Sequence, residues 1–535
     1  MFHCCEISQR NLYLGISKNR FWVKFRSKQE APSMALTVTS WNIAAINNNP
    51  WEYWITYDEA SYVELMKNLE IFVTNPAGKD VPVEQVFTPK MFDILIQNMK
   101  NQNWDGLEEV TREWNENYKN RKIISQFITD KTIGVKRLTS MPDRLTNTIN
   151  IPGSEEPVCR PSVINIYSGD LSTTSFWFDQ WLHFFFNETI TLTSRSGEAQ
   201  TKKICDLLVK IQHAKYPAIS EEEEKISIPL QLLCLAIFDC ILVHIMNTIS
   251  PAWQTIRQQI ADNLNKKKVP RTCEIIHTKY PSDIICLQEA GSFLIHQLKG
   301  YLEFPNSHFI VYPEKMDNTR DQNSIILLKK SIFDESTAKE ISEEVIENVK
   351  QTTGQNPVVA GDLCVVSIKN VSGVDYFIAS FHGDTNGLAT IPVLNSLLNI
   401  YESNYPNHKL IYSLDANSHK VASKLYLGVA QFTEAFVAKG VTSCFGDQPD
   451  PDNYTTFNAR TFLQAQLSKA TKSDEIKSAA DRNLKDYVLF KNQQFKTIKW
   501  LKDNTGNYNF IEDIVFPTLF FPSDHAILHV ELEIL

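Results

Sequence analysis

The spacing of hydrophobic and polar residues changes twice along the 535-residue chain. A short run rich in β-branched and aromatic residues, 36–43, predicts one buried strand near the start. From about 58 to 268, apolar residues recur mainly at helical spacing. Beyond about 273, short apolar runs bounded by polar residues return. The pattern predicts an α/β protein in which a long helical segment separates the first strand from the others.

Within the helical segment, Thr88-Pro89 has the residue types of a helix start, a capping hydroxyl followed by proline. An apolar stripe at 204, 207, 208 and 211 predicts another helix. Two charged runs, Glu221–Glu224 and Lys266–Lys268, are typical of solvated surface, and the second indicates a basic linker.

The nineteen residues from Ile228 to Met246 are mostly apolar and long enough to be considered as a membrane span. Gln231, Asp239 and His244 interrupt the run. Because an aspartate near the middle of a span is costly, we expect a buried core helix and no transmembrane segment.

The second half of the chain contains several strand-like runs. Ile284–Leu287 is continuously apolar, as is typical of a strand buried on both faces. The remaining predicted strands are Ser324–Leu328, Leu363–Ile368, Asp375–Phe381, Leu410–Leu414, Tyr487–Phe490 and His525–Leu532.

Carboxylate, amide and imidazole side chains occur where these strands end or begin. Four strands are followed by such residues, and the last strand is preceded by them. If the last strand runs antiparallel to its neighbours, all these side chains gather at one edge of a sheet. The residues are Asn42, Glu289, His382, Asp415, Asn417, Asp524 and His525.

Asn42, Glu289 and Asp524 offer the oxygen ligands that suit Mg²⁺, with Mn²⁺ as the alternative cation. His525 is a candidate general base for a water molecule. Asp415 and Asn417 can orient that water, and His382 can donate to developing negative charge. This combination predicts metal-assisted hydrolysis of a phosphoester.

Six short motifs carry a resemblance to a known family. In chain order they are SWNIA, IICLQEA, ASFHG, SLDAN, LKDYVLF and PSDHAIL. Together they resemble the endonuclease/exonuclease/phosphatase superfamily, whose fold is that of deoxyribonuclease I. The resemblance covers about 35–57 and 275–535, and it implies a four-layered α/β sandwich of two packed mixed sheets flanked by helices.

The resemblance implies a role for each motif residue. Asn42 and Glu289 correspond to the metal-binding pair, Asp524 to a further metal-side carboxylate, His382 to the histidine at the scissile phosphate, Asp415 and Asn417 to the residues that position the nucleophile and steady the transition state, His525 to the terminal histidine, and Asp486 to the carboxylate that orients it.

The chain departs from the family pattern in two places. Leu414 precedes Asp415 where the family usually has glycine. Asn42 and Glu289 are 247 residues apart, whereas a few dozen residues are usual. We therefore predict a catalytic domain formed by 34–57 and 275–535, with 58–274 as a helical insertion that binds a protein partner or acts as a lid.

Residues near the motifs are candidates for substrate binding. Asn386 lies shortly after His382. Arg460 ends the stretch NYTTFNAR and is either a phosphate contact or a surface or ion-paired arginine. The aromatic residues of 51–54 either stack against bases at the mouth of a cleft or pack the insertion onto the sheet.

Composition adjusts the interpretation. The chain has 53 Lys and Arg against 62 Asp and Glu, a net charge of −9, which argues against a passive nucleic-acid coat but not against a metal-dependent nuclease. The ten cysteines form no C-x-x-C pair, which favours a reducing, intracellular location, cytoplasmic or nuclear. Residues 1–33 are rich in Lys and Arg, so they are either an organelle-targeting segment or an extension before a natural start at Met34.

The sequence thus predicts a Mg²⁺-dependent phosphoester hydrolase, and a nuclease acting on nucleic acid is our first interpretation. The alternative is a phosphodiesterase or phosphatase that acts on a lipid headgroup or a small phosphorylated metabolite. A non-catalytic scaffold is less favoured, because the complete set of motif residues is present.

Overall fold

The structure is a computed structural model, and it describes residues 35–45, 47–151, 157–193, 199–300, 304–316, 322–465 and 470–535. The predicted N-terminal extension, 1–33, lies outside these residues, as does Met34.

The first of two large sheets contains the first and last strands of the chain. β1 (Ala35–Asn42) pairs in parallel with β6 (Ile284–Ala290) and antiparallel with β18 (Ile527–Ile534). The predicted antiparallel direction of the last strand is therefore confirmed. The sheet order is β17 (Phe495–Asp503), β18, β1, β6, β8 (Asn323–Lys329) and β7 (His308–Val311).

The second sheet is also mixed. β11 (Asp375–His382) and β12 (Lys409–Asp415) are parallel neighbours, and His382 pairs in register with Asp415. The sheet order is β13 (Val441–Ser443), β16 (Asp486–Lys491), β12, β11, β10 (Leu363–Lys369) and β9 (Lys339–Glu340). A small pair, β14 (Thr456–Asn458) and β15 (Asp481–Asn483), lies outside both sheets.

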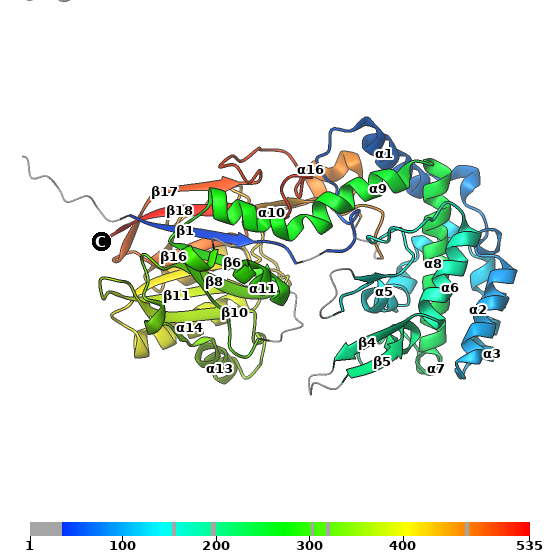
Figure 1. Cartoon of the computed structure of the whole chain (residues 1–535), viewed down its shortest axis with the longest axis horizontal. Helices are drawn as coiled ribbons and strands as arrows, with labels where there is room; N and C mark the ends of the chain where they lie inside the picture. The colour runs from blue at the N-terminus through cyan, green and yellow to red at the C-terminus, as the bar shows by residue number, and fades with distance from the viewer. Residues whose placement is uncertain are drawn as a thin grey trace, which may run out of the picture. The chain divides into compact units, whose positions relative to one another are not determined.

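The two sheets pack face to face because alternate side chains of each strand point inward. In β6, Ile284 and Cys286 join the apolar cluster between the sheets, whereas Ile285 and Leu287 face the helices outside. Helices cover both outer faces (Figure 1), so the expected α/β fold of two mixed sheets flanked by helices is confirmed. On the second sheet they are α13 (Ser342–Thr353), α14 (Thr390–Asn404) and α15 (Val429–Val437), and on the first α10 (Lys268–Glu274), η7 (Ile275–Lys279) and α11 (Ser292–Gly300).

The segment between β1 and β6 is mainly helical, as predicted. Its second helix begins at Pro89 with the Thr88 side chain accepting a hydrogen bond from the Met91 amide, which confirms that helix start. The larger elements are α1 (Ala60–Thr74), α2 (Pro89–Asn101), α3 (Leu107–Glu116), η4 (Ile123–Ile128), α4 (Lys131–Val135), α5 (Ser140–Thr146), α6 (Thr174–Phe186), α7 (Glu221–Lys225), α8 (Ser227–Ile249) and α9 (Trp253–Ala261), with the hairpins β2 (Thr148–Ile149)–β3 (Val158–Cys159) and β4 (Thr189–Thr193)–β5 (Ala199–Lys203).

The apolar helix α8 is the core of this helical block. Its length and composition match those of a membrane span, but 89% of its most apolar stretch is buried inside the protein. Asp239, in its middle, accepts a hydrogen bond at 2.8 Å from the buried Arg160 guanidinium. The helix therefore packs as the core helix that the sequence predicted.

The block and the first sheet share one apolar cluster. Trp41 and Ile527 of the sheet belong to the same cluster as Leu235 of α8. Residues 35–535 accordingly form one compact unit, and the division into a catalytic domain and an insertion stays a prediction.

The helix expected over 204–211 is wrong. Only η5 (Ile204–Leu207), a 3₁₀ turn, forms there, and the chain then continues in extended conformation. Leu208 and Ile211 are buried, and the Ile211 amide donates to Ser227 Oγ at 3.2 Å. The apolar residues at this spacing thus belong to a buried segment that is not helical. Buried positions at helical spacing do not by themselves show that a segment is a helix.

Candidate active site

The polar ends of the central strands of both sheets meet at one edge. β1 and β6 bring Asn42 into register with Gln288, directly before Glu289. β11, β12 and β16 bring His382, Asp415 and Asp486 together. The edge thus collects side chains that are hundreds of residues apart in the sequence.

Asn42 connects the two sheets at this edge. Its Nδ2 donates to Glu289 Oε1 at 3.1 Å and to Asp415 Oδ2 at 2.9 Å. The Ala44 amide donates to Asn42 Oδ1 at 2.9 Å, which fixes the orientation of the amide group. Two carboxylates are therefore held next to each other by one buried side chain.

Glu289 lies in an irregular part of β6, where the register with β8 shifts and its φ is +54°. Bulges of this kind redirect side chains next to active sites. Glu289 Oε2 accepts from the Ala45 amide at 2.8 Å, and Oε1 lies 3.3 Å from His382 Nε2. Burial would raise the pKa of Glu289, but His382 and these donors lower it well below its usual range. The carboxylate is therefore ionised.

His525 lies between two aspartates. Its Nδ1 is 3.0 Å from Asp486 Oδ2, and its Nε2 is 3.7 Å from Asp415 Oδ2. Thr455 Oγ1 donates to Asp486 Oδ2 at 2.5 Å and fixes that carboxylate. Burial would lower the pKa of His525, but the two aspartates raise it to about 10. The geometry is that of an imidazole oriented by one carboxylate and directed at another.

Asn417 closes the loop after β12. Its φ is +47°, its amide donates to Asp415 Oδ1 at 2.8 Å, and its Nδ2 donates to the Gly383 carbonyl at 3.1 Å. Leu414, which stands where the family usually has glycine, is buried within the strand. The chain therefore turns at Asn417, after Asp415 is already in place.

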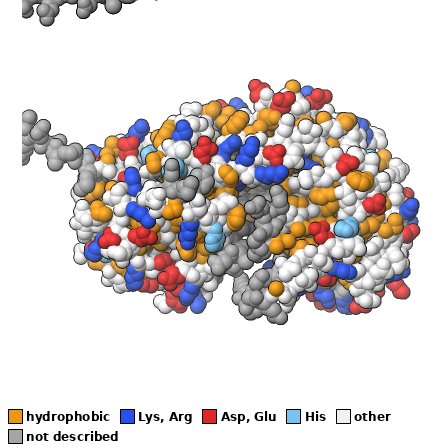
Figure 2. Space-filling view, in the orientation of Figure 1, with side chains coloured by type: hydrophobic (Ala, Val, Ile, Leu, Met, Phe, Trp, Pro, Cys, Tyr) orange, Lys and Arg blue, Asp and Glu red, His pale blue; other side chains and the backbone are white. Residues whose placement is uncertain are grey.

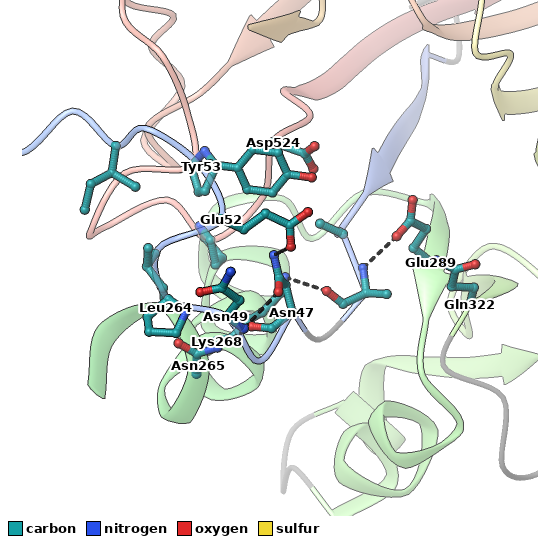
Figure 3. A pocket seen from close by; sticks show the side chains of 16 residues that line it. Asn47, Asn49, Glu52, Tyr53, Leu264, Asn265, Lys268, Glu289, Gln322 and Asp524 are labelled. Atoms are coloured by element: carbon teal, nitrogen blue, oxygen red, sulfur yellow. Dashed lines mark hydrogen bonds between the residues drawn. The ribbon is translucent and has the colours of Figure 1, made fainter. Parts of the chain in front are cut away.

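Asp524 lies apart from the other two predicted metal ligands. Among the described residues, the ligating atoms of Glu289, His382 and Asp415 lie within 4.8 Å of one another, and Asp524 does not belong to that group. It accepts from Asn458 Nδ2 at 3.1 Å and lies beside the Tyr53 ring (Figure 3). Asp524 and Glu289 nevertheless line the same cavity.

Of the two predicted substrate contacts, the Arg460 side chain has an ion-pair partner within the protein, whereas for Asn386 the contact involves the backbone N–H. The Arg460 guanidinium forms an ion pair with Glu52 and lies 5.3 Å from the centre of the Tyr53 ring. The Asn386 amide donates to Asp384 Oδ2 at 3.2 Å, within the loop after β11. Their roles in substrate binding stay predictions.

The aromatic residues of 51–54 divide between the two interpretations. Trp51 and Trp54 are buried in the shared apolar cluster and pack the block onto the sheet. Tyr53 lines the cavity next to Asp524.

The solvated linker expected at Lys266–Lys268 is wrong for Lys268. This residue begins α10, is 6% exposed and lines the cavity beside Glu289. The preceding segment, η6 (Asp262–Lys266), is π-helical, and its wider turn changes which side chains face inward. A run of like charges therefore does not show which of its members is buried.

Thr455 and Asn458 were not singled out individually from the sequence, yet they hold Asp486 and Asp524. Both lie in the stretch NYTTFNAR, which ends with Arg460, so their local sequence was the available signal.

The cluster fits a hard divalent cation in its chemistry. Glu289 and Asp415 offer ionisable oxygens close together, as Mg²⁺ prefers. Asn42 would contribute its oxygen only after its amide group rotates, because Nδ2 now faces both carboxylates. Glu289 and Asp415 are accordingly the better placed ligands.

Known proteins are similar to part of the chain or to its fold. Residues 80–258 match a family model described as a domain of unknown function (DUF8234), and no curated protein matches the chain. Similar solved structures include the human Nocturnin catalytic domain with bound sulfate (17% identity, 50% of this chain, 86% of that chain, TM-score 0.33) and D. rerio TDP2 complexed with a single-strand DNA product (14%, 50%, 92%, 0.33). Another is an endonuclease/exonuclease/phosphatase family protein from Bacteroides thetaiotaomicron (15%, 50%, 89%, 0.31), which bears the name of the superfamily that the motifs resemble.

Proposed function

We propose that this chain is a divalent-metal-dependent phosphoester hydrolase of the endonuclease/exonuclease/phosphatase type, and that it cleaves phosphodiester bonds of nucleic acid. The observation that supports this most strongly is the unbroken series of contacts from Glu289 through Asn42 and Asp415 to His525, each no longer than 3.7 Å. A purely structural edge has no need to gather three carboxylates and two imidazoles.

Glu289 and Asp415 would hold Mg²⁺ in this proposal, with Asp524 on the cavity side, and the ion would supply charge for the phosphoryl oxygens. His382, hydrogen-bonded to Glu289, donates to a phosphoryl oxygen. His525, oriented by Asp486, accepts the proton of the attacking water. The pKa of His525 falls when a cation neutralises Asp415, so the neutral imidazole becomes available at lower pH.

Among the described residues, the surface shown in Figure 2 has no extended basic area that would attract a polyanion over a long distance. Basic and acidic side chains are intermixed on the face shown in Figure 2. Positive charge for a nucleic acid therefore comes mainly from the metal and from individual residues near the edge. An intracellular location, proposed from the cysteine pattern, accords with such a substrate.

The test is hydrolysis by the purified chain with Mg²⁺, with Mn²⁺ and with a chelator. The substrates are single-stranded and duplex DNA, RNA, poly(A), sphingomyelin, inositol phosphates and bis-nitrophenyl phosphate. Glu289→Gln and His525→Ala remove the proposed ligand and base, and each is expected to reduce the rate by at least about 100-fold.

Two matched variants control for general damage. Glu274→Gln and His296→Ala change exposed residues that have no role in the proposed mechanism and should retain the wild-type rate. Preferred cleavage of a lipid or inositol phosphate would replace nucleic acid as the substrate. No metal-dependent turnover on any substrate would overturn the proposal.

A further inference from the structure

A cavity of about 290 Å³ adjoins the cluster (Figure 3). One wall is the segment after β1, which includes Asn47 and Tyr53, and another contains Glu289 and Asp524. The helical block supplies the third wall through Asn265 and Lys268. Because Glu289 lines both the cavity and the cluster, a substrate with its phosphate at the cluster can place its remaining part in the cavity.

Lys268 is a buried cation with few partners. Its Nζ donates to the Ala45 carbonyl at 3.1 Å, and in the described part of the chain it forms no ion pair within 4 Å. An ammonium group has three N–H donors, and burying it without an anion is costly. Burial accordingly lowers the pKa of Lys268 to about 8.

The acids of the cavity do not account for Lys268. Glu289 already accepts from Ala45, Asn42 and His382, and Asp524 accepts from Asn458. Glu52, the third acid of the cavity, forms an ion pair with Arg460. The carboxylates of Asp524 and Glu289 act to raise the pKa of Lys268, but in the described residues neither lies within the 4 Å of an ion pair with it. Its remaining donors are therefore available to an anion that enters the cavity.

Asn265 presents the second unsatisfied group. Its Nδ2 donates to the Asn47 carbonyl, which fixes the orientation of the amide. Its Oδ1 is buried, lies on a cavity-lining residue and has no hydrogen-bond partner in the described ranges. Buried acceptors of this kind are normally paired, so a ligand that brings an O–H or N–H donor would complete the site.

We propose that Lys268 and Asn265 form a subsite for a second phosphate of the substrate, next to the phosphate that is cleaved. Lys268 binds the phosphate oxygens, and Asn265 accepts from a hydroxyl or amino group of the unit that carries them. The inference rests on the proposed hydrolase function and specifies its substrate, a strand or nucleotide with two neighbouring phosphates. The helical block thereby takes part in choosing the substrate.

The test compares thymidine dinucleotides that carry a terminal phosphate, at the 5′ or the 3′ end, with the dinucleotide that carries none. For the wild type we expect kcat/KM to be at least about tenfold higher with one of the phosphorylated forms. In the Lys268→Met variant, kcat/KM should be about equal for the phosphorylated and the unphosphorylated dinucleotides. Lys268→Gln removes the charge but keeps a donor for Ala45, so it serves if the methionine variant does not fold.

Lys267→Met is the matched control, because Lys267 is exposed on the same segment, and it should keep the wild-type ratio. A wild-type ratio near one, or an unchanged ratio in folded Lys268 variants, would overturn the subsite.

A binding measurement separates this inference from the proposed activity. Calorimetry with adenosine 3′,5′-bisphosphate and adenosine 5′-monophosphate, in chelator, needs no turnover. Tighter binding of the bisphosphate by at least about tenfold, lost in Lys268→Gln, supports the subsite even if no substrate is hydrolysed. Equal binding of both nucleotides would contradict the subsite, whatever the hydrolysis panel shows.

Discussion

The helical block and the edge of the two sheets each bury a charged cluster, and the two clusters are built in opposite ways. In the block, the fully buried Arg160 donates to Asp239 Oδ2 at 2.8 Å and to Asp143 Oδ1 at 2.7 Å. Ser162 and Trp181 also donate to Asp239, at 2.7 and 3.0 Å. The charges of this cluster are therefore paired, and its oxygens have donors.

At the edge, three carboxylates share one amide and two imidazoles. In the described residues, no Lys or Arg forms an ion pair with Glu289, Asp415 or Asp486. Like charges held this close repel one another, and the two imidazoles, whose pKa values the acids raise, offset that repulsion only in part. Burial of charge therefore serves stability in the block, whereas the edge keeps an excess of negative charge that a cation would neutralise.

The largest effect is expected from breaking the paired cluster. Arg160→Met leaves Asp239 buried without its counter-charge in the middle of α8, so the free energy of unfolding should fall by about 3–5 kcal/mol. Urea denaturation followed by circular dichroism measures the change.

The exposed neighbour Arg144 gives the matched control, and Arg144→Met should change the free energy of unfolding by less than about 0.5 kcal/mol. A loss of under 1 kcal/mol for Arg160→Met would mean that the block does not depend on its paired charges.

The opposite result is expected at the edge. Asp415→Asn keeps the shape of the side chain but removes one of the adjacent negative charges. The free energy of unfolding should change by less than about 1 kcal/mol, because the relief of repulsion between carboxylates offsets the weakened contacts of this side chain with Asn42 and His525. Metal-dependent hydrolysis should fall at least about 100-fold, since a proposed ligand is lost.

Asp447→Asn, at an exposed carboxylate, should alter neither quantity. If Asp415→Asn destabilised the protein as strongly as Arg160→Met, the edge cluster would be structural and the contrast between the two regions would fail.

The same contrast explains what the sequence could predict. Most elements were predictable because their signals are local: the Thr88 cap, the apolar run of β6 and the polar residues at the strand ends. Asn42, Glu289 and Asp415 could be named because each lies at or just after the end of a predicted strand. Their contact could be expected once the direction of β18 was assumed, since strand direction decides which ends share an edge.

What the sequence did not predict depends on packing across long separations. Lys268 belongs to a basic run that is typical of solvated surface, but it is buried shortly after the π-helical η6, and its Nζ donates to the Ala45 carbonyl. The sequence left an ion-paired Arg460 open as an alternative to a phosphate contact, but it did not identify Glu52 as the partner. Neither partner is visible from local spacing, because the residues that meet are more than 200 positions apart.

A third buried charge tests the comparison at the smallest scale. Lys502 of β17 is 9% exposed, and its Nζ donates to the Tyr454 carbonyl at 2.9 Å and lies 4.0 Å from the centre of the Phe510 ring. Burial lowers its pKa to about 8, with Arg482 acting in the same direction and Glu512 opposing it. It is a buried cation without a direct anionic partner in the described residues. Its removal should therefore not lower the free energy of unfolding, in contrast to the removal of Arg160 from the block.

Because the folded pKa lies below the unfolded value of about 10.4, the unfolded chain binds more protons between pH 8 and 10. The free energy of unfolding therefore gains a contribution that rises with pH across this window, by at most about 1.4 kcal/mol per pH unit. Lys502→Met should remove that contribution and be more stable than the wild type at pH 7, whereas Lys496→Met, at an exposed lysine of the same strand, should not. Urea denaturation at pH 7, 8, 9 and 10 measures the difference. Suppose that Lys502→Met were less stable at pH 7 and its free energy of unfolding depended on pH as that of the wild type does. The aromatic contacts of the ammonium would then stabilise it, and an unpaired buried charge would not by itself be destabilising in this protein.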